Sequence, residues 1–195
     1  MNSEKVKYIC NKMLEIDWQP KLSGAAMRVL GECDTLLESM YLFGAIYFLE
    51  SICQKANRIS IGEFPIDTCN AIHRGKEIEG IFFASAWPLW YSEVGEDCGP
   101  QSILFVPQIE FGPNYHHDFG IFYGDENGTK ESWKLRYGIE VDGYIMHRDR
   151  REKDKYRDNI ISYPVIRLLE EIHNPLKWFR LIMEKDVDYF YEQID

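Results

Sequence analysis

The sequence lacks the features that mark membrane, secreted and zinc-binding proteins. No apolar run approaches the roughly 20 residues of a membrane-spanning helix. Its first residues, Met1 to Ile9, mix charged and polar side chains where a signal peptide would be apolar. The five cysteines are widely spaced without a C-x-x-C pair, so neither a disulfide framework nor a zinc knuckle is indicated. We therefore expect a soluble, cytoplasmic protein with mostly buried thiols and no membrane partner.

Basic residues are scarce as well. The chain has 22 Lys and Arg against 32 Asp and Glu, which gives a formal net charge of -10. Binding of a phosphate backbone draws on clustered Lys and Arg, so this balance argues against a broad, nonspecific nucleic-acid surface. A small basic patch on an acidic body is still compatible with the composition.

The sequence does contain enough apolar material for one substantial core. With 195 residues, 45% of them hydrophobic, a single domain spanning residues 1–195 is expected. Helical spacing of apolar residues predicts a short helix at about residues 3–16 and a longer one at about 34–55. Asp34 is the expected N-cap of the longer helix, with Glu38 in its first turn. That helix is apolar over most of its girth, which predicts a central position in the core.

The segment from residue 56 to residue 100 shows little regular pattern. Ile81 to Ala84 has the pattern of a strand, but the rest of the segment is rich in turn residues and aromatic residues. We expect an insertion or an irregular lobe that lies against the core.

The second half of the chain carries a clearer strand pattern. Three apolar, aromatic-rich runs separated by turn residues predict an antiparallel meander. The runs are residues 103–111, 115–123 and 135–141. A basic helix at 148–161, a strand at 165–169 and a last helix from Pro175 follow. This order predicts an α/β sandwich with a central mixed sheet of about four or more strands flanked by helices.

The end of the third run places two carboxylates on one side of an otherwise apolar strand. Alternate strand residues face the same way, so Glu140 and Asp142 point together. Ile139 and Val141, on the other side, point into a core. Two adjacent carboxylates are unfavourable unless a cation, most simply a metal ion, lies between them. Asp118 similarly interrupts the middle run, where a strand rarely carries a charge.

The order of these residues resembles a known nuclease pattern. Glu38 lies on a helix, Asp118 on the second strand and the run Glu140-Val141-Asp142-Gly143 on the third, and His147 follows. Further matching runs are Pro107-Gln108-Ile109, Lys153-Asp154, Arg157-Asp158, Val165-Ile166-Arg167-Leu168 and Glu171-Ile172. The arrangement resembles the PD-(D/E)XK nuclease superfamily, and more closely its small restriction-endonuclease-like branch with an E-x-D-G-x-x-x-H strand end. The resemblance covers about residues 34–183, without 56–100.

The resemblance implies a restriction-endonuclease-like fold and a metal-dependent endonuclease that hydrolyses phosphodiester bonds in DNA with Mg²⁺ or Mn²⁺. It implies that Asp118 and Glu140 hold the ion and that Glu38 orients a water or a second ion. Gln108 would line the site. The residue chemistry agrees, because Mg²⁺ prefers carboxylate oxygens and keeps several waters, one of which can attack phosphorus.

One position departs from the superfamily pattern. The Lys that usually stands two residues after the Glu is Asp142 here. Three explanations remain open. Asp142 is a third metal ligand, or Lys153 or Lys155 on the next helix supplies the cation, or the site is inactive.

Candidate nucleic-acid contacts follow the acidic strand. Three basic residues at helical spacing form a stripe that could meet a phosphate backbone: Arg150, Lys153 and Arg157. A solvated helix of internal ion pairs is the alternative. His147 could bind phosphate or carry a proton, or it could cap or pack. Neighbours in a strand face opposite ways, so at most one of His116 and His117 can join the surroundings of Asp118, and we expect structural roles for both.

A second class of function fits the same residues. The missing Lys, the net charge of -10 and the aromatic segment 56–100 favour a catalytically inactive interaction module on the nuclease fold. Its acidic surface could imitate nucleic acid toward a basic protein partner. A role in RNA processing is a third hypothesis, and a homodimer also stays open.

Overall fold

The computed structural model describes residues 21–57, 66–84, 102–112, 115–125, 129–141 and 161–168. Within these ranges two helices, α2 (Gly24–Leu30) and α3 (Leu36–Asn57), precede six strands. The strands are β1 (Thr68–His73), β2 (Lys76–Ala84), β3 (Ser102–Gly112), β4 (Tyr115–Gly124), β5 (Lys134–Val141) and β6 (Val165–Leu168). They form one sheet in chain order, antiparallel from β1 to β5 and parallel between β5 and β6. The predicted α/β class and mixed sheet are confirmed.

Strands β3 to β6 lie where the sequence pattern predicts them, and their ends differ from the predicted ends by one residue or none. The pattern does not predict β1 or the first half of β2. These residues pair as a hairpin, from Thr68 opposite Ile81 to His73 opposite Lys76, so this part of the expected irregular lobe belongs to the sheet. Within β1 only Ala71 is buried, and an edge strand of this kind leaves no alternating pattern to recognise.

The parallel pairing of β5 and β6 requires a long connection between them. Gly138 pairs with Val165, so the chain has to return along the sheet before β6 begins, which takes roughly a dozen or more residues. The basic helix predicted at 148–161 belongs to this connection and, apart from its last residue, lies outside the described residues. The helices predicted at 3–16 and from Pro175 also lie outside them. Neither described helix is long and apolar enough to cross a membrane.

Helix α3 begins slightly later than the sequence pattern predicts. Its first helical residue is Leu36, so Thr35 and not Asp34 is the N-cap. The N–H of Glu38 donates to Thr35 Oγ1 at 3.1 Å, and this hydroxyl donates to Glu38 Oε1 at 2.7 Å. A threonine hydroxyl suits this position because it can accept one hydrogen bond and donate another.

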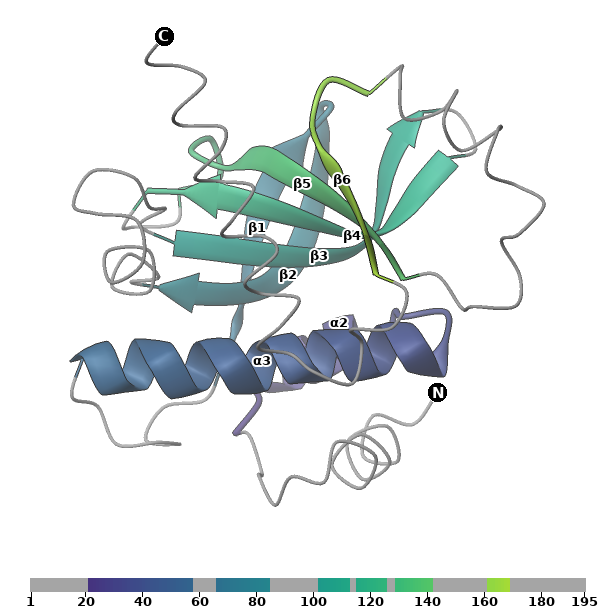
Figure 1. Ribbon diagram of the computed structural model, residues 1–195. Coiled ribbons are helices and arrows are strands. Elements are labelled where there is room, and N and C mark those ends of the chain that lie inside the picture. The colour runs from purple at the N-terminus through teal and green to yellow at the C-terminus, as the bar shows by residue number, and fades with distance from the viewer. Residues whose placement is uncertain are drawn as a thin grey trace, which may run out of the picture.

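The two helices cover one face of the sheet, as Figure 1 shows below the strands. The main core lies between the helices and the sheet. It includes strand residues that are at most 1% exposed: Phe105, Phe119, Ile121, Tyr137 and Ile139. From residue 40 to residue 46 α3 is buried all round, which confirms its predicted central position. A second cluster combines strand residues that face the other way with Trp133, which directly precedes β5: Leu104, Val106, Ile109, Phe122 and Trp133.

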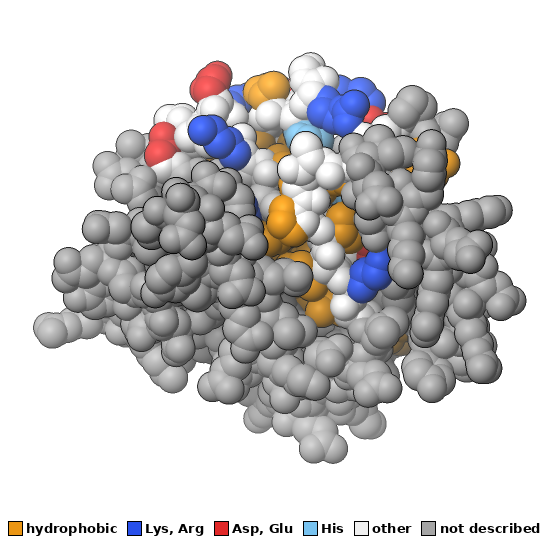
Figure 2. Space-filling model, turned by 45° about the horizontal axis from the view of Figure 1, so that its top comes forward, with side chains coloured by type: hydrophobic (Ala, Val, Ile, Leu, Met, Phe, Trp, Pro, Cys, Tyr) orange, Lys and Arg blue, Asp and Glu red, His pale blue; other side chains and the backbone are white. Residues whose placement is uncertain are grey.

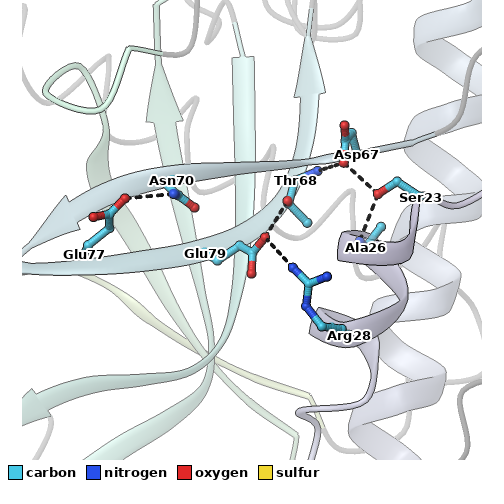
Figure 3. Close-up of polar contacts among 8 residues, drawn as sticks. All are labelled: Ser23, Ala26, Arg28, Asp67, Thr68, Asn70, Glu77 and Glu79. Carbon is cyan, nitrogen blue, oxygen red and sulfur yellow. Dashed lines mark hydrogen bonds and ion pairs between the residues drawn. The ribbon is translucent and has the colours of Figure 1, made fainter.

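A polar network fixes α2 to the first hairpin of the sheet, as Figure 3 shows. The hydroxyl of Ser23, the N-cap of α2, accepts from an N–H of the first turn and donates to Asp67 Oδ1 at 2.6 Å. Arg28 lies 3.5 Å from a Glu79 oxygen that also accepts from the Thr68 hydroxyl. The Ser23 hydroxyl and the Thr68 N–H lower the pKa of Asp67. These contacts therefore stabilise the fold above the ordinary pKa of Asp and are lost as the pH falls through the lowered value.

Gly80 is the point where β2 passes very close to β3. A Cβ at this position would lie 2.5 Å from the carbonyl oxygen of Phe105, which belongs to the backbone and cannot rotate aside. Gly80→Ala should therefore lower the free energy of unfolding by roughly 1–3 kcal/mol through overpacking. Urea denaturation measures this change.

Gly24→Ala is the matched control for this prediction. A Cβ at Gly24 meets nothing within 4 Å, and alanine is favoured over glycine inside a helix by about 0.5–1 kcal/mol. The control variant should be as stable as the wild type or more so. A Gly80→Ala protein with wild-type stability would contradict the close approach of the two strands.

Candidate functional site

The predicted site residues on the strands lie at one end of the sheet, where the pairing of β4 with β5 stops. The last pair is Phe119 opposite Ile139, so Asp118 and Glu140 are the next residues on their strands. Beyond this pair the end of β3 and the start of β4 turn away from β5 (Figure 1). We call this divergence of β4 from β5 beyond Asp118 and Glu140 the strand fork.

Asp118 is bonded to β5 through its side chain. Its Oδ2 accepts a hydrogen bond from the backbone N–H of Val141 at 2.6 Å. In a regular ladder this N–H would donate to a backbone carbonyl of the neighbouring strand. Here the Asp118 carboxylate accepts the bond instead. The contact brings the half-buried Asp118 beside the residue that follows Glu140.

Gln108 has an unusual backbone in the middle of β3. Its φ of 52° is left-handed, a conformation that costs an L-residue about 1–2 kcal/mol. It lies across from Asp118, between the pairs Pro107 with Phe119 and Ile109 with His117, but Gln108 and Asp118 are not themselves paired. Its side-chain Nε2 donates to Glu38 Oε2 at 2.8 Å, which joins the strand fork to the N-terminus of α3. Strain of this kind persists where surrounding contacts hold it, and here the bond to Glu38 is such a contact.

Glu38 has the helix-end role that its position in the sequence predicts, together with a contact to the sheet. Its Oε2 accepts from the Asp34 N–H at 2.9 Å and from Gln108, while its Oε1 accepts from Thr35. The residue is only 4% exposed. Three donors and the positive end of the helix dipole therefore stabilise a buried carboxylate. Glu38 reaches the site through Gln108.

Glu140 is paired with a histidine to which the sequence pattern assigns only a structural role. His117 Nδ1 lies 2.6 Å from Glu140 Oε1, and the two residues are 0% and 8% exposed. A carboxylate accepts hydrogen bonds, so this contact is satisfied when His117 carries a proton on Nδ1 and donates it to Glu140. Ile139 and Val141 pack into the core between the sheet and the helices. Glu140, which lies between them in the strand, therefore faces the side of the sheet away from the helices.

Apolar groups enclose the His117 ring. It stacks on Phe111 with ring centroids 4.1 Å apart and meets the edge of Tyr163 at 5.7 Å. A Cβ at Gly138 would lie 2.6 Å from the ring, so only glycine leaves room for it. Burial raises the pKa of Tyr163 to about 12, which keeps its hydroxyl protonated. In the part of the chain that the structure describes, His117 Nε2 is buried without a hydrogen-bond partner.

A cationic residue lies on the other side of Glu140. Arg167 of β6 pairs with Glu140 in the parallel ladder, and paired strand residues face the same side of a sheet. Arg167 is half-buried. Glu140 therefore lies between an imidazole on β4 and an arginine on β6, although position 142 carries no Lys.

An open groove of about 690 Å³ lies beside the strand fork, between the β1–β2 turn and the end of β3, and Gln108 lines it. Lys76 pairs with Glu110 there, and Arg74 donates to the carbonyl of Phe111. Figure 2 shows charged side chains of both signs gathered with a histidine along one edge of the visible face. Among the described residues that line the groove, glutamates outnumber Arg74 and Lys76, a balance that does not favour a polyanion.

The described residues contain only part of the predicted metal site. Among them, no three His, Cys, Asp or Glu side chains converge on a point that could hold an ion. Asp142, the predicted third ligand, lies outside the described residues. So do the predicted phosphate contacts and the predicted replacement for the motif Lys: His147, Arg150, Lys153 and Arg157.

The donor set still fits a hard divalent cation. Asp118 and Glu140 offer carboxylate oxygens, which Mg²⁺ and Mn²⁺ prefer. A carboxylate has about four acceptor positions, so the hydrogen bonds from Val141 and His117 are compatible with a metal bond to the same groups.

Regular strand alternation would not have predicted the contact between His117 and Glu140. Ile109 packs in the same cluster as Leu104 and Val106, although alternation would turn it to the opposite face. The left-handed Gln108 lies between Val106 and Ile109, so the facing of β3 changes at this point. His117 is opposite Ile109 in the register and shares its side of the sheet, which is the side of Glu140. The residue types give no signal for this change.

Comparisons with known proteins add no assignment for this site. No family model, no curated protein and no solved structure matches the chain.

The left-handed backbone of Gln108 gives a test by paired substitutions. Gln108→Ala and Gln108→Gly both remove the amide that donates to Glu38, but only the alanine keeps the strain of a side chain at φ 52°. The alanine variant should be less stable than the glycine variant by about 1 kcal/mol in urea denaturation. Equal stability of the two variants would contradict the strained backbone.

Proposed function

We propose that this chain is a divalent-metal-dependent nuclease that hydrolyses phosphodiester bonds in DNA. The observation that carries the proposal is the position of Asp118 and Glu140 on neighbouring strands at the strand fork. The resemblance in sequence assigns the same two residues to metal binding. The strand register makes these two residues neighbours across the strand fork, as two ligands of one ion must be.

In this proposal each acidic residue has a distinct role. Asp118 and Glu140 hold the ion, and Asp142 is a third ligand beside them. When bound, Mg²⁺ or Mn²⁺ supplies Lewis-acid activation of a water and neutralises charge on the phosphate. Glu38 holds Gln108 in place at the strand fork, where the Gln108 side chain lines the site.

The proposal also needs a cation in place of the motif Lys. Arg167 is one candidate, because it is in register with Glu140 and faces the same side of the sheet. Lys153 or Lys155, which the sequence pattern suggests, is the other. Both would offset the negative charge that the carboxylates and the substrate bring together.

Contacts to DNA are assigned to the basic segment after β5. The groove beside the strand fork carries more glutamates than basic residues, so phosphate binding draws on Arg150, Lys153 and Arg157, with His147 nearby. The chain has a net charge of -10, and few basic residues are available to bind phosphates. Its binding to DNA should therefore be weak at high salt. This favours a local contact with DNA over a broad binding surface.

Cleavage of plasmid and linear DNA in the presence of Mg²⁺ or Mn²⁺ tests the proposal. Asp118→Asn and Glu140→Gln should each lower the cleavage rate by roughly 100-fold or more, because each removes a charged ligand of the ion. EDTA should abolish cleavage. Glu131→Gln, at an exposed carboxylate in the turn before β5, is the matched control and should cleave like the wild type.

Two results would contradict the nuclease proposal. One is the absence of cleavage of DNA by the folded wild-type protein with either ion, and the other is full activity of Asp118→Asn. Cleavage of RNA alone would change the substrate class. Stable capture of a basic protein partner by an inactive wild type would favour the interaction module, in which protein donors satisfy both carboxylates.

A further inference from the structure

We infer that His117 is a positioning residue that holds Glu140 in one orientation as a metal ligand, by donating from Nδ1 to Glu140 Oε1. This inference rests on the proposed nuclease function and deepens it, because His117 is not among the residues that the sequence pattern assigns to the site. The donor lies on β4 and the ligand on β5, so the contact sets the geometry across the strand fork.

The position of the His117 ring is tightly defined. The ring is fully buried, stacks on Phe111 at an interplanar angle of 19° and meets Tyr163 edge-on at 76°. On the remaining side the backbone of Gly138 approaches so closely that a Cβ would lie 2.7 Å from Nε2. A donor with so little freedom can hold a carboxylate in one orientation.

The buried Nε2 atom argues against a purely structural histidine. An aromatic or aliphatic side chain in this apolar enclosure would leave no polar atom unsatisfied, whereas His117 leaves Nε2 without a partner among the described residues. A buried, unsatisfied nitrogen lowers stability. Within the described ranges, the Nδ1 donation to Glu140 is the one interaction of this ring that an apolar residue could not supply.

The consequence for metal binding follows from the general behaviour of residues that orient ligands. Groups that hydrogen-bond to a metal ligand fix its orientation, and their removal typically weakens metal binding about 10–100-fold. At this site Glu140 comes at the end of its ladder with β4, and the His117 side chain joins the two strands beyond that ladder. Loss of the His117 donor should therefore lower the affinity for the ion, although both carboxylate ligands are still present.

Calorimetric titration of the full chain with Mn²⁺ tests this inference. His117→Phe keeps the stacking on Phe111 but cannot donate, and it should weaken Mn²⁺ binding roughly 10–100-fold. His117→Asn has an amide nitrogen close to the position of Nδ1 and should recover most of the lost affinity. Gly138→Ala displaces the ring without removing it and should weaken binding like the phenylalanine variant.

The outcomes separate this inference from the proposed function. A wild type that does not bind Mn²⁺ overturns both. A folded His117→Phe protein that binds Mn²⁺ like the wild type overturns only the role of His117. If the phenylalanine variant does not fold, wild-type affinity in Gly138→Ala overturns the inference.

Nitrogen-15 spectra of the imidazole in the metal-free wild type provide a second readout that needs no variant. The inference expects the tautomer with its proton on Nδ1, because this nitrogen donates to Glu140. The tautomer with its proton on Nε2 would leave no Nδ1 donor and would overturn the inference.

Discussion

The hydrogen bond between His117 and Glu140 joins β4 to β5 at the point where the two strands begin to diverge. A carboxylate that is only 8% exposed is costly unless donors or a cation compensate the loss of water. The imidazole supplies such a donor, and the need to accommodate it explains why position 138 has no side chain. The packing of Phe111 against the ring follows from the same contact.

A second polar contact approaches the strand fork from the helical side of the sheet. Glu38 caps α3 and accepts the side chain of Gln108, whose left-handed backbone is held by this bond. Across from Gln108 on β4 lies Asp118, which accepts from the backbone of β5. The bond between α3 and β3 and the bond between β4 and β5 therefore lie at neighbouring positions of the sheet. A change in any of these contacts should alter the positions of the candidate metal ligands, Asp118 and Glu140.

Much of the fold could be predicted from the sequence because burial leaves a periodic pattern. The long apolar runs of β3 to β5 and the apolar girth of α3 predicted these elements with ends within one residue for the strands and about two for the helix. The hairpin of β1 with β2 could not be predicted in the same way, since its outer strand buries only Ala71. The N-cap is Thr35, one residue after the predicted Asp34, because the Thr35 hydroxyl both accepts a hydrogen bond from Glu38 and donates one to it.

The sequence predicts the candidate site only at positions where one residue departs visibly from the pattern around it, such as a charge within an apolar strand. Charges in the middle of apolar strands pointed to Asp118 and Glu140, and the structure sets these residues on neighbouring strands. The role of His117 depends on the change of facing at Gln108, a left-handed backbone in a residue that is not glycine. No local residue preference predicts such a change, so the partner of Glu140 became visible only in three dimensions.

Anomalous diffraction from crystals of the wild-type protein grown with Mn²⁺ tests the central claim most directly. The account predicts an anomalous peak bonded to carboxylate oxygens of both Asp118 and Glu140 at roughly 2.1 Å, with His117 still donating to Glu140. A well-ordered strand fork without a peak, or a peak that contacts neither carboxylate, would contradict it.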